Sequence, residues 1–204
     1  MKDKKILITA SVLLFLIGTL YLIQQGKNNT SNVFNQNTIA PKQKISTARE
    51  CTGQPTPSQT EGPYYKTGSP KRKNITEDVS GEKLVVTGFV YDSNCQPIAS
   101  AWLDFWQADS NGQYDNQGYI LRGHQFTDEN GKYNLETIVP AAYETRPSHI
   151  HVKVRNGNGP VLTSQLYFPD ETQNTRDSIF NAALVMKISE ENGGTVGTFD
   201  FILP

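Results

Sequence analysis

From residue 84 onward, the chain consists of short apolar runs, several of which alternate apolar and polar residues. The first run, residues 84–91, is rich in β-branched and aromatic side chains and ends at the turn signal Asp92-Ser-Asn. Similar runs predict strands at residues 101–107, 124–127, 132–137, 149–154, 164–168 and 198–203. Turn residues at 109–112 and 128–131 separate some of them. This spacing predicts an all-β domain of about seven or eight strands, arranged as a sandwich or barrel. The only weak helical pattern covers residues 177–188.

The first 25 residues have a different pattern. Lys2, Lys4 and Lys5 precede residues 6–23, an uncharged and mostly apolar stretch of 18 residues. This stretch exceeds the core of a typical signal peptide and approaches the ~20 residues that cross a bilayer. No small-x-small cleavage site and no cysteine for lipidation follow it. Residues 1–25 are therefore predicted to be an uncleaved signal anchor that places the rest of the chain outside the cytoplasm. A cleaved signal peptide, which would release a secreted protein, is the alternative.

Residues 26–48 are rich in Asn, Gln, Thr and Ser and lack hydrophobic periodicity. This composition predicts a disordered linker. The remaining residues, 49–204, are enough for one domain with its own hydrophobic core.

Charge and cysteine content narrow the function classes. The formal net charge is −1 and the basic residues are dispersed, which argues against a nucleic-acid partner. The only basic cluster, Lys71-Arg72-Lys73, is expected to be a solvated loop. Two cysteines, Cys51 and Cys95, lie beyond the linker, and in an exported protein such a pair is expected to form a disulfide. The alternative is two unrelated buried thiols.

Two of the three histidines, His149 and His151, are separated by one residue at the start of a predicted strand. Side chains of a strand alternate between its faces, so both imidazoles lie on one face and Ile150 lies on the other. Two imidazoles in this arrangement can bind one metal ion if further ligands come from elsewhere in the chain. Without such ligands, they are polar residues on a solvated strand.

Tyrosines are candidates for the further ligands. Tyr143 precedes His149 by six residues, and Tyr114 follows the turn at 109–112. A phenolate is a hard anionic ligand that suits Fe(III) better than zinc or cuprous copper. Two phenolates and two imidazoles leave a ferric ion a position for hydroxide and room for substrate. A copper site of an oxidase is the alternative that uses the same residue types.

A series of short motifs runs from about Thr56 to Phe168 in a specific order. They are Pro57-Ser-Gln-Thr-Glu-Gly-Pro-Tyr-Tyr65, Gly88-Phe-Val-Tyr-Asp92, Phe105-Trp-Gln-Ala108, Gly112-Gln-Tyr114, Thr127-Asp-Glu-Asn-Gly131, Arg146-Pro-Ser-His-Ile-His151 and Gln165-Leu-Tyr-Phe168. In this order, the sequence resembles the intradiol ring-cleavage dioxygenases. The resemblance implies a β-sandwich with long connecting loops and a non-haem Fe(III) cofactor. It also implies a catechol-type substrate, which O2 opens between its two hydroxyls to a cis,cis-muconate-type dicarboxylic acid.

The resemblance assigns the iron ligands. Tyr143 and His149 would be the axial pair, and Tyr114 and His151 the equatorial pair. Tyr119 is the alternative to Tyr114, which is favoured because its distance along the chain from the preceding tryptophan matches the family.

The resemblance also implies the roles of neighbouring residues. Tyr143 would leave the metal and accept a substrate proton, Arg146 would stabilise charge on the reacting ring, and Gln165 would polarise a substrate oxygen. Tyr64 and Tyr65 would line the pocket.

The link between Tyr143 and Arg146 is shorter than in many members of the family, and a different class of protein remains as an alternative. Only two residues lie between Tyr143 and Arg146, as in compact extracellular members, so the site is expected to have less wall around it. His124 lies outside every ligand position. The rival is a transthyretin-like or carboxypeptidase-regulatory-like module on the cell surface, which binds without catalysis and would not need the tyrosine and histidine set. A homo-oligomer is left open.

Overall fold

The computed structural model describes residues 51–191 and 193–204. This part of the chain contains nine strands and two single-turn 3-10 helices: β1 Lys83–Tyr91, β2 Trp102–Gln107, β3 Arg122–Phe126, β4 Lys132–Ile138, β5 His149–Arg155, β6 Leu162–Tyr167, η1 Asn174–Arg176, η2 Ala182–Leu184, β7 Lys187–Glu191, β8 Gly194–Thr198 and β9 Phe201–Ile202. The predicted signal anchor at 1–25 and the predicted linker at 26–48 lie outside the described residues. Within the described ranges, no helix is long and apolar enough to cross a membrane.

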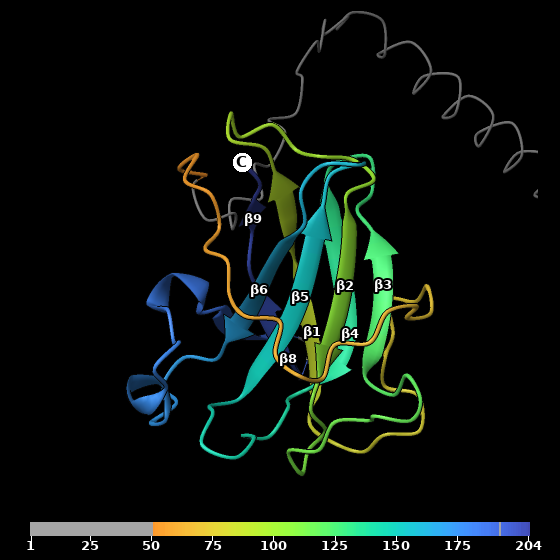
Figure 1. Ribbon diagram of the computed structural model, residues 1–204, viewed down its shortest axis with the longest axis vertical. Helices are drawn as coiled ribbons and strands as arrows, with labels where there is room; N and C mark the ends of the chain where they lie inside the picture. Colours follow the sequence, from red (N-terminus) through yellow and green to blue (C-terminus); the bar gives the residue numbers. More distant parts are fainter. Residues whose placement is uncertain (1–50, 192) are drawn as a thin grey trace, which may run out of the picture. The chain divides into compact units, whose positions relative to one another are not determined.

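The strands form two sheets (Figure 1). One sheet has the order β4-β1-β8-β7, and β9 pairs with β1 farther along that strand. The other has the order β3-β2-β5-β6. Buried side chains from both sheets share one core, with Val86 and Leu135 from the first sheet and Phe105 and Val152 from the second. The predicted all-β fold is therefore confirmed, and the two sheets form a sandwich.

The β3-β2-β5-β6 sheet is unusual because both of its faces are covered. In β2, every residue from Leu103 to Gln107 is buried, and β5 is buried at each of its first four positions. An extended segment, residues 51–75, runs across the face that points away from the core (Figure 1); we call it the arm. Its backbone bonds to both edge strands, because Gln59 N donates to Thr163 O over 2.8 Å and Pro70 O accepts from His124 N over 3.0 Å. The arm thus shields the outer face of this sheet from water.

Strand register determines which side chains share that outer face. His151 lies opposite Trp106 on β2 and Gln165 on β6, and Trp106 lies opposite Arg122 on β3. Paired residues of antiparallel strands point to the same side. These four side chains therefore form a row across the sheet under the arm, and His149 starts the next row.

Cys51 and Cys95 form the disulfide that the sequence predicted, with their Cα atoms 5.8 Å apart. The bond joins the start of the arm to the turn after β1. It closes a loop with a sequence separation of 44, which stabilises the fold by roughly 4 kcal/mol on the chain-entropy model.

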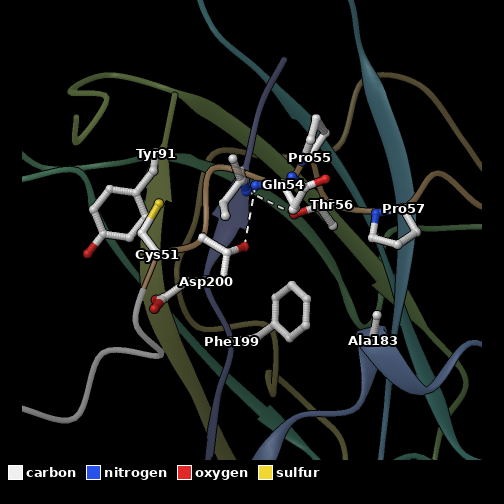
Figure 2. Close-up of a pocket in the computed structure, with 11 residues that line it drawn as sticks. Cys51, Gln54, Pro55, Thr56, Pro57, Tyr91, Ala183, Phe199 and Asp200 are labelled. Carbon is white, nitrogen blue, oxygen red and sulfur yellow. Dashed lines mark hydrogen bonds between the residues drawn. The ribbon is translucent and has the colours of Figure 1, made fainter. Parts of the chain in front are cut away.

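A cavity of about 250 Å³ opens beside this disulfide (Figure 2). Apolar side chains make up much of its wall, including those of Tyr91, Phe199 and Ile202. None of the residues predicted to bind iron or substrate lines it.

The C-terminal part differs from the predicted single strand at 198–203 and from the weak helical pattern at 177–188. The structure instead has the hairpin of β7 and β8, and then β9, with both β8 and β9 parallel to β1. β7 buries only one side chain in part, Ile188, so no apolar alternation marks it. Asp200 lies between β8 and β9, where its carboxylate accepts the backbone N–H of Phe89 over 2.8 Å. Residues 182–184 form one 3-10 turn, with the side chain of Asn181 accepting from the N–H of Ala183.

Candidate active site

The two imidazoles of β5 meet under the arm. The Nε2 atoms of His149 and His151 are 3.1 Å apart, and each side chain is 3% exposed. The ring of Trp106 stacks on His151 at a centroid distance of 4.8 Å and an angle of 9°. This stacking fixes the orientation of the His151 ring against Trp106, and its Nε2 lies near Nε2 of His149.

The protonation of these imidazoles follows from their surroundings. Nδ1 of His149 lies 2.7 Å from the carbonyl oxygen of Pro147, so this nitrogen carries the proton and donates it. Nε2 of His149 then carries a lone pair, which is directed at His151. Burial lowers the pKa of His149 to about 4 and lowers the pKa of His151 well below its usual value. Both rings are neutral at physiological pH, which is the form that binds metal ions.

Tyr114 brings a phenol to this pair. Its hydroxyl is 3.4 Å from Nε2 of His149, a weak contact by hydrogen-bond standards. The turn before it depends on Gly112, which has φ +78° and packs so close to Ala142 that a Cβ would lie 2.4 Å from the carbonyl oxygen. Burial raises the pKa of Tyr114, and the charges of Arg146 and Arg122 oppose this effect.

Tyr143 lies beside Tyr114, with the two rings edge to face at a centroid distance of 5.6 Å. A tight turn fixes it, because Arg146 N donates to Tyr143 O over 2.8 Å. The hydroxyl of Tyr143 contacts the hydroxyl of Tyr64 and donates to the Glu144 carboxylate over 2.8 Å. These two hydrogen bonds raise the pKa of Tyr143. In the described part of the chain, Tyr143 makes no hydrogen bond to either imidazole, so it stands next to the cluster and not inside it.

The arm supplies the wall of the site. The ring of Tyr64 stacks on Tyr114 at 4.3 Å and 8°, so this residue contacts both tyrosines that the sequence predicts as ligands. Gly62 packs against the His151 ring, where a Cβ would lie at an ordinary contact distance of 3.5 Å, and its φ of +74° favours glycine. Tyr65 lies deeper, where its ring packs on Trp106 and its hydroxyl donates to the Asp104 carboxylate over 3.1 Å.

The donor atoms fit a single metal ion. The lone pair on Nε2 of His149 needs a cation or a proton to face, and Nε2 of His151 lies 3.1 Å away. If Nδ1 of His151, which is buried without a hydrogen-bond partner among the described residues, carries the proton, both Nε2 lone pairs are available to one cation. The phenol of Tyr114 adds an oxygen donor at the same point. In the described residues, no group of three or more His, Cys, Asp or Glu side chains could hold a metal. A site here therefore depends on tyrosine oxygen.

Comparison with known proteins decides the family. A family model described as Dioxygenase (Dioxygenase_C) matches residues 60–203. The chain belongs to the intradiol ring-cleavage dioxygenase family. This confirms the resemblance that the motifs indicated and assigns the chain to a family of oxidoreductases.

Individual proteins that are similar to this intradiol dioxygenase support the same family assignment. The chlorocatechol 1,2-dioxygenase of Pseudomonas sp. (strain P51) is 30% identical over 171 residues, covering 70% of this chain and 68% of that protein. The catechol 1,2-dioxygenase of Acinetobacter baylyi is 30% identical over 141 residues, which are 54% of this chain and 45% of that protein. The chain therefore spans about half the length of this relative. Among solved structures, the dioxygenase domain of a dioxygenase carbohydrate-binding protein fusion from Streptomyces sp. SirexAA-E has a TM-score of 0.71 and 49% identity, covering 74% of this chain and 98% of that chain.

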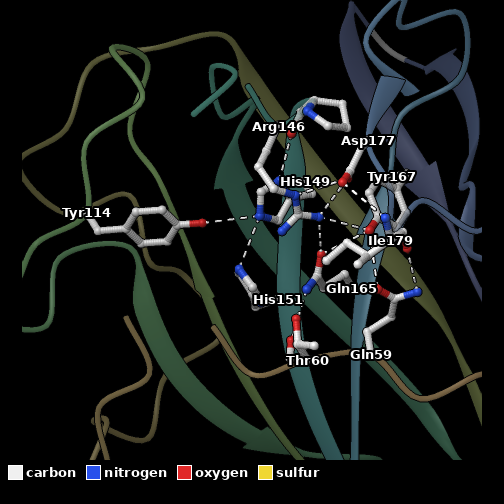
Figure 3. Close-up of polar contacts among 11 residues, drawn as sticks. Gln59, Thr60, Tyr114, Arg146, His149, His151, Gln165, Tyr167, Asp177 and Ile179 are labelled. Carbon is white, nitrogen blue, oxygen red and sulfur yellow. Dashed lines mark hydrogen bonds and ion pairs between the residues drawn. The ribbon is translucent and has the colours of Figure 1, made fainter. Parts of the chain in front are cut away.

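Arg146 anchors a polar network beside the imidazoles of this intradiol dioxygenase (Figure 3). Its Nη2 donates to Gln165 over 2.7 Å, to the Tyr167 hydroxyl over 3.0 Å and to Asp177 over 2.9 Å, and its Nε donates to the same Asp177 oxygen over 3.0 Å. The Gln165 side chain in turn donates to the carbonyl oxygen of Thr60 on the arm over 2.9 Å. The network therefore orients Arg146 and ties β6 to the arm.

Sequence reasoning missed Asp177, Tyr167 and Thr60. Tyr167 could have been found, because it lies two residues from Gln165 on a predicted strand and hence on the same face. Asp177 lies in an irregular segment 31 residues from Arg146, and no local pattern marks it. The carbonyl of Thr60 carries no sequence signal.

The structure places two further residues away from the imidazoles. The hydroxyl of Tyr119 donates to the carbonyl oxygen of Thr67 over 2.8 Å. His124 lies on the outer face of β3, where its Nδ1 is 2.7 Å from the carbonyl oxygen of Ser69. Neither residue contacts the His149 and His151 pair in the described part of the chain.

Asp177→Asn is expected to lower the free energy of unfolding by about 2 kcal/mol, because it leaves Arg146 without its counter-charge in a largely buried place. The side chains of Arg146 and Asp177 are 21% and 5% exposed, so water replaces little of the lost interaction. Urea denaturation measures the loss. Asp170→Asn is the matched control, because Asp170 is exposed in the same segment. Equal stability of the two variants would contradict a structural role for the ion pair.

Proposed function

We propose that this protein is a non-haem Fe(III)-dependent intradiol dioxygenase that cleaves a catechol-type ring with O2 to a cis,cis-muconate-type dicarboxylic acid. The observation that supports this most is the contact of the Tyr114 hydroxyl with Nε2 of His149, which itself lies 3.1 Å from Nε2 of His151, in a chain of this family. Two neutral imidazoles and a phenol suit a hard ferric ion.

The proposed ligands are Tyr114, His149, His151 and Tyr143. Bound ferric iron would supply Lewis acidity and accept electron density from a chelated catechol. The burial of His149 and His151 keeps both rings neutral, so each ring has one nitrogen with a lone pair for the metal. Trp106 and the arm exclude water from the back of the site.

Tyr143 is the proposed acceptor of a substrate proton. Its hydroxyl already lies between Tyr64 and the Glu144 carboxylate, which can hold the protonated phenol once it has received the proton. Glu144 is exposed, so this proton has a route to solvent. The phenol of Tyr143 therefore has a defined place to rest away from the imidazoles.

Arg146 and Gln165 have the proposed task of orienting and stabilising the reacting ring. With Nη2 and Nε of Arg146 bonded to Asp177, Gln165 and Tyr167, the guanidinium cannot rotate, and Nη1 remains for a ligand. Although Asp177 neutralises its charge, the fixed guanidinium can donate a hydrogen bond from Nη1 to an oxygen of the substrate on which negative charge develops. Since the Gln165 oxygen accepts from both Arg146 and Tyr167, its first effect is to hold Arg146 in place.

We also propose that the domain works outside the cytoplasm, anchored by residues 1–25 or secreted after their cleavage. The Cys51–Cys95 disulfide supports an oxidising location. No nucleic-acid partner is proposed.

Metal analysis and one visible spectrum test the function. The purified protein should bind about one iron per chain and show a broad tyrosinate-to-iron absorption that shifts when catechol is added without O2. Admission of O2 should then yield the dicarboxylic acid. A folded, colourless protein that cannot be reconstituted with ferric iron would refute the proposal and favour the binding-module alternative. Stoichiometric copper in place of iron would favour the oxidase alternative.

A further inference from the structure

Charges around the proposed site bear on which ring substituents it accepts, an inference that rests on the proposed function. A catechol that carries a carboxylate needs a cation that can pair with it, because an unpaired charge loses its hydration on entering a protein site. Whether a free cation faces the proposed site therefore decides whether such a catechol is accepted.

Arg146 is the cation beside the imidazoles, and Asp177 already neutralises it. Two of its nitrogens bond to the same Asp177 oxygen, at 2.9 and 3.0 Å. Nη2 also donates hydrogen bonds to the side-chain oxygens of Gln165 and Tyr167. A carboxylate on a substrate would therefore meet a hydrogen-bond donor of Arg146 that belongs to a neutral ion pair. It would not meet a free positive charge.

Arg122, the next cation, is 2% exposed. Its Nη1 donates to the carbonyl oxygen of Tyr64 over 2.6 Å, and its Nε and Nη2 donate to the carbonyl oxygen of Asp115. The guanidinium of Arg122 is thus buried, and it links the backbone of the arm at Tyr64 to the backbone at Asp115, next to Tyr114.

The two lysines in this region are also occupied. Lys153 pairs with Glu61 at 2.5 Å. Lys66 donates to the carbonyl oxygen of Gln117 over 2.7 Å and lies over the ring of Tyr119. Neither ammonium group is directed at the imidazole pair by these contacts.

Glu144 gives the mouth of the site the opposite charge. It sits in the two-residue turn between Tyr143 and Arg146, with φ +50°, and its side chain is exposed. Its carboxylate contacts the Tyr143 hydroxyl and has no ion-pair partner within the described part of the chain. Any substrate that takes the place of Tyr143 must come close to this negative charge.

We infer that this site takes catechols whose ring carries no acidic substituent, and that Glu144 is a specificity-determining residue that disfavours acidic ones. The neutralised Arg146 offers an anionic substituent no compensation, and the exposed Glu144 carboxylate repels it. Because the site is open at this turn, a neutral substituent meets no comparable penalty there.

The test compares catechol with protocatechuate, a catechol that carries a ring carboxylate, on the full iron-loaded protein. Both probes offer the same two hydroxyls, so the ratio of their kcat/KM values isolates the effect of the substituent. The wild-type ratio should favour catechol by at least about tenfold. Glu144→Gln should narrow the ratio by about threefold and Glu144→Lys by about tenfold, with a smaller effect at high salt. Anaerobic binding titrations with both probes should show the same shifts in Kd.

Glu129→Gln and Glu129→Lys are the matched controls, because Glu129 is an exposed carboxylate in the β3–β4 turn, at the far end of the sheet from His149. Their ratios should equal that of the wild type. A wild-type protein that cleaves both probes equally well would overturn the inference alone, as would a ratio that Glu144→Lys leaves unchanged or that Glu129→Lys shifts as much. A wild-type protein that binds iron but cleaves neither probe would overturn the proposed function and this inference with it.

Discussion

His151→Ala is expected to lose its iron and its ring-cleaving activity, while His124→Ala keeps both. Removing His151 takes away one of the two Nε2 atoms that lie 3.1 Å apart and removes the ring that stacks on Trp106. Replacing residues that only support metal ligands typically costs 10- to 100-fold in metal affinity, so loss of a ligand should cost more than about 100-fold. Competition with a chelator measures the affinity, and metal analysis after gel filtration measures the iron retained.

His124→Ala is a suitable control because it removes an imidazole from the same face of the same sheet. His124 lies opposite Asp104 on β2, and its ring bonds to Ser69 of the arm. The variant can therefore lose some stability through a looser arm, which thermal denaturation reports separately. Equal iron loss in both variants would show that the ligand strand is misassigned.

The sequence predicted the shared face of His149 and His151 because strand periodicity is local. It did not predict that Trp106 stacks on His151, since this depends on the register between β2 and β5, which is fixed by the turns and the core far from the site. The burial of the imidazoles also escaped prediction. The arm that covers them has prolines and glycines and no periodicity, and its hydrogen bonds go to strands about 50 to 150 residues away in the chain.

The spacing of residues along the chain predicted which tyrosine approaches the imidazoles, but not how the tyrosines pack on one another. Spacing favoured Tyr114 over Tyr119, and the structure brings Tyr114 to His149 through the turn at Gly112, whereas Tyr119 bonds to Thr67. The motif Gln-Thr-Glu-Gly-Pro also indicated that Tyr64 lines the pocket. Its stacking on Tyr114 could not be predicted, because it requires the arm and the 109–121 loop to meet, and the buried Arg122 holds them together.

Asp177 shows what remains beyond sequence reasoning. The interpretation of Arg146 as a fixed cation lacked its counter-charge, which comes from a segment without regular structure. This changes the electrostatics of the site, because a paired guanidinium orients a substrate without adding a full positive charge.

Tyr143→Phe and Tyr114→Phe are expected to behave differently, because the two phenols have different surroundings and different proposed tasks. Tyr143 rests against Tyr64 and Glu144, outside the imidazole pair, so its hydroxyl can leave the metal at little cost. Tyr143→Phe should therefore retain iron on Tyr114, His149 and His151 and lose mainly the acceptance of a substrate proton. General-base groups typically contribute 10²- to 10⁴-fold, so kcat/KM should fall by roughly that factor.

Tyr114→Phe should instead weaken iron binding itself. Its hydroxyl is the oxygen that contacts His149 within the buried cluster, and no other phenol of the described residues does so. The tyrosinate absorption that persists in the substrate complex should consequently disappear in this variant and persist in Tyr143→Phe. Anaerobic stopped-flow spectra with catechol distinguish the two variants, and Tyr119→Phe serves as the control with an unchanged spectrum. If Tyr114→Phe keeps that band while Tyr119→Phe loses it, then Tyr119 is the lasting ligand and the 109–121 loop must rearrange when iron binds.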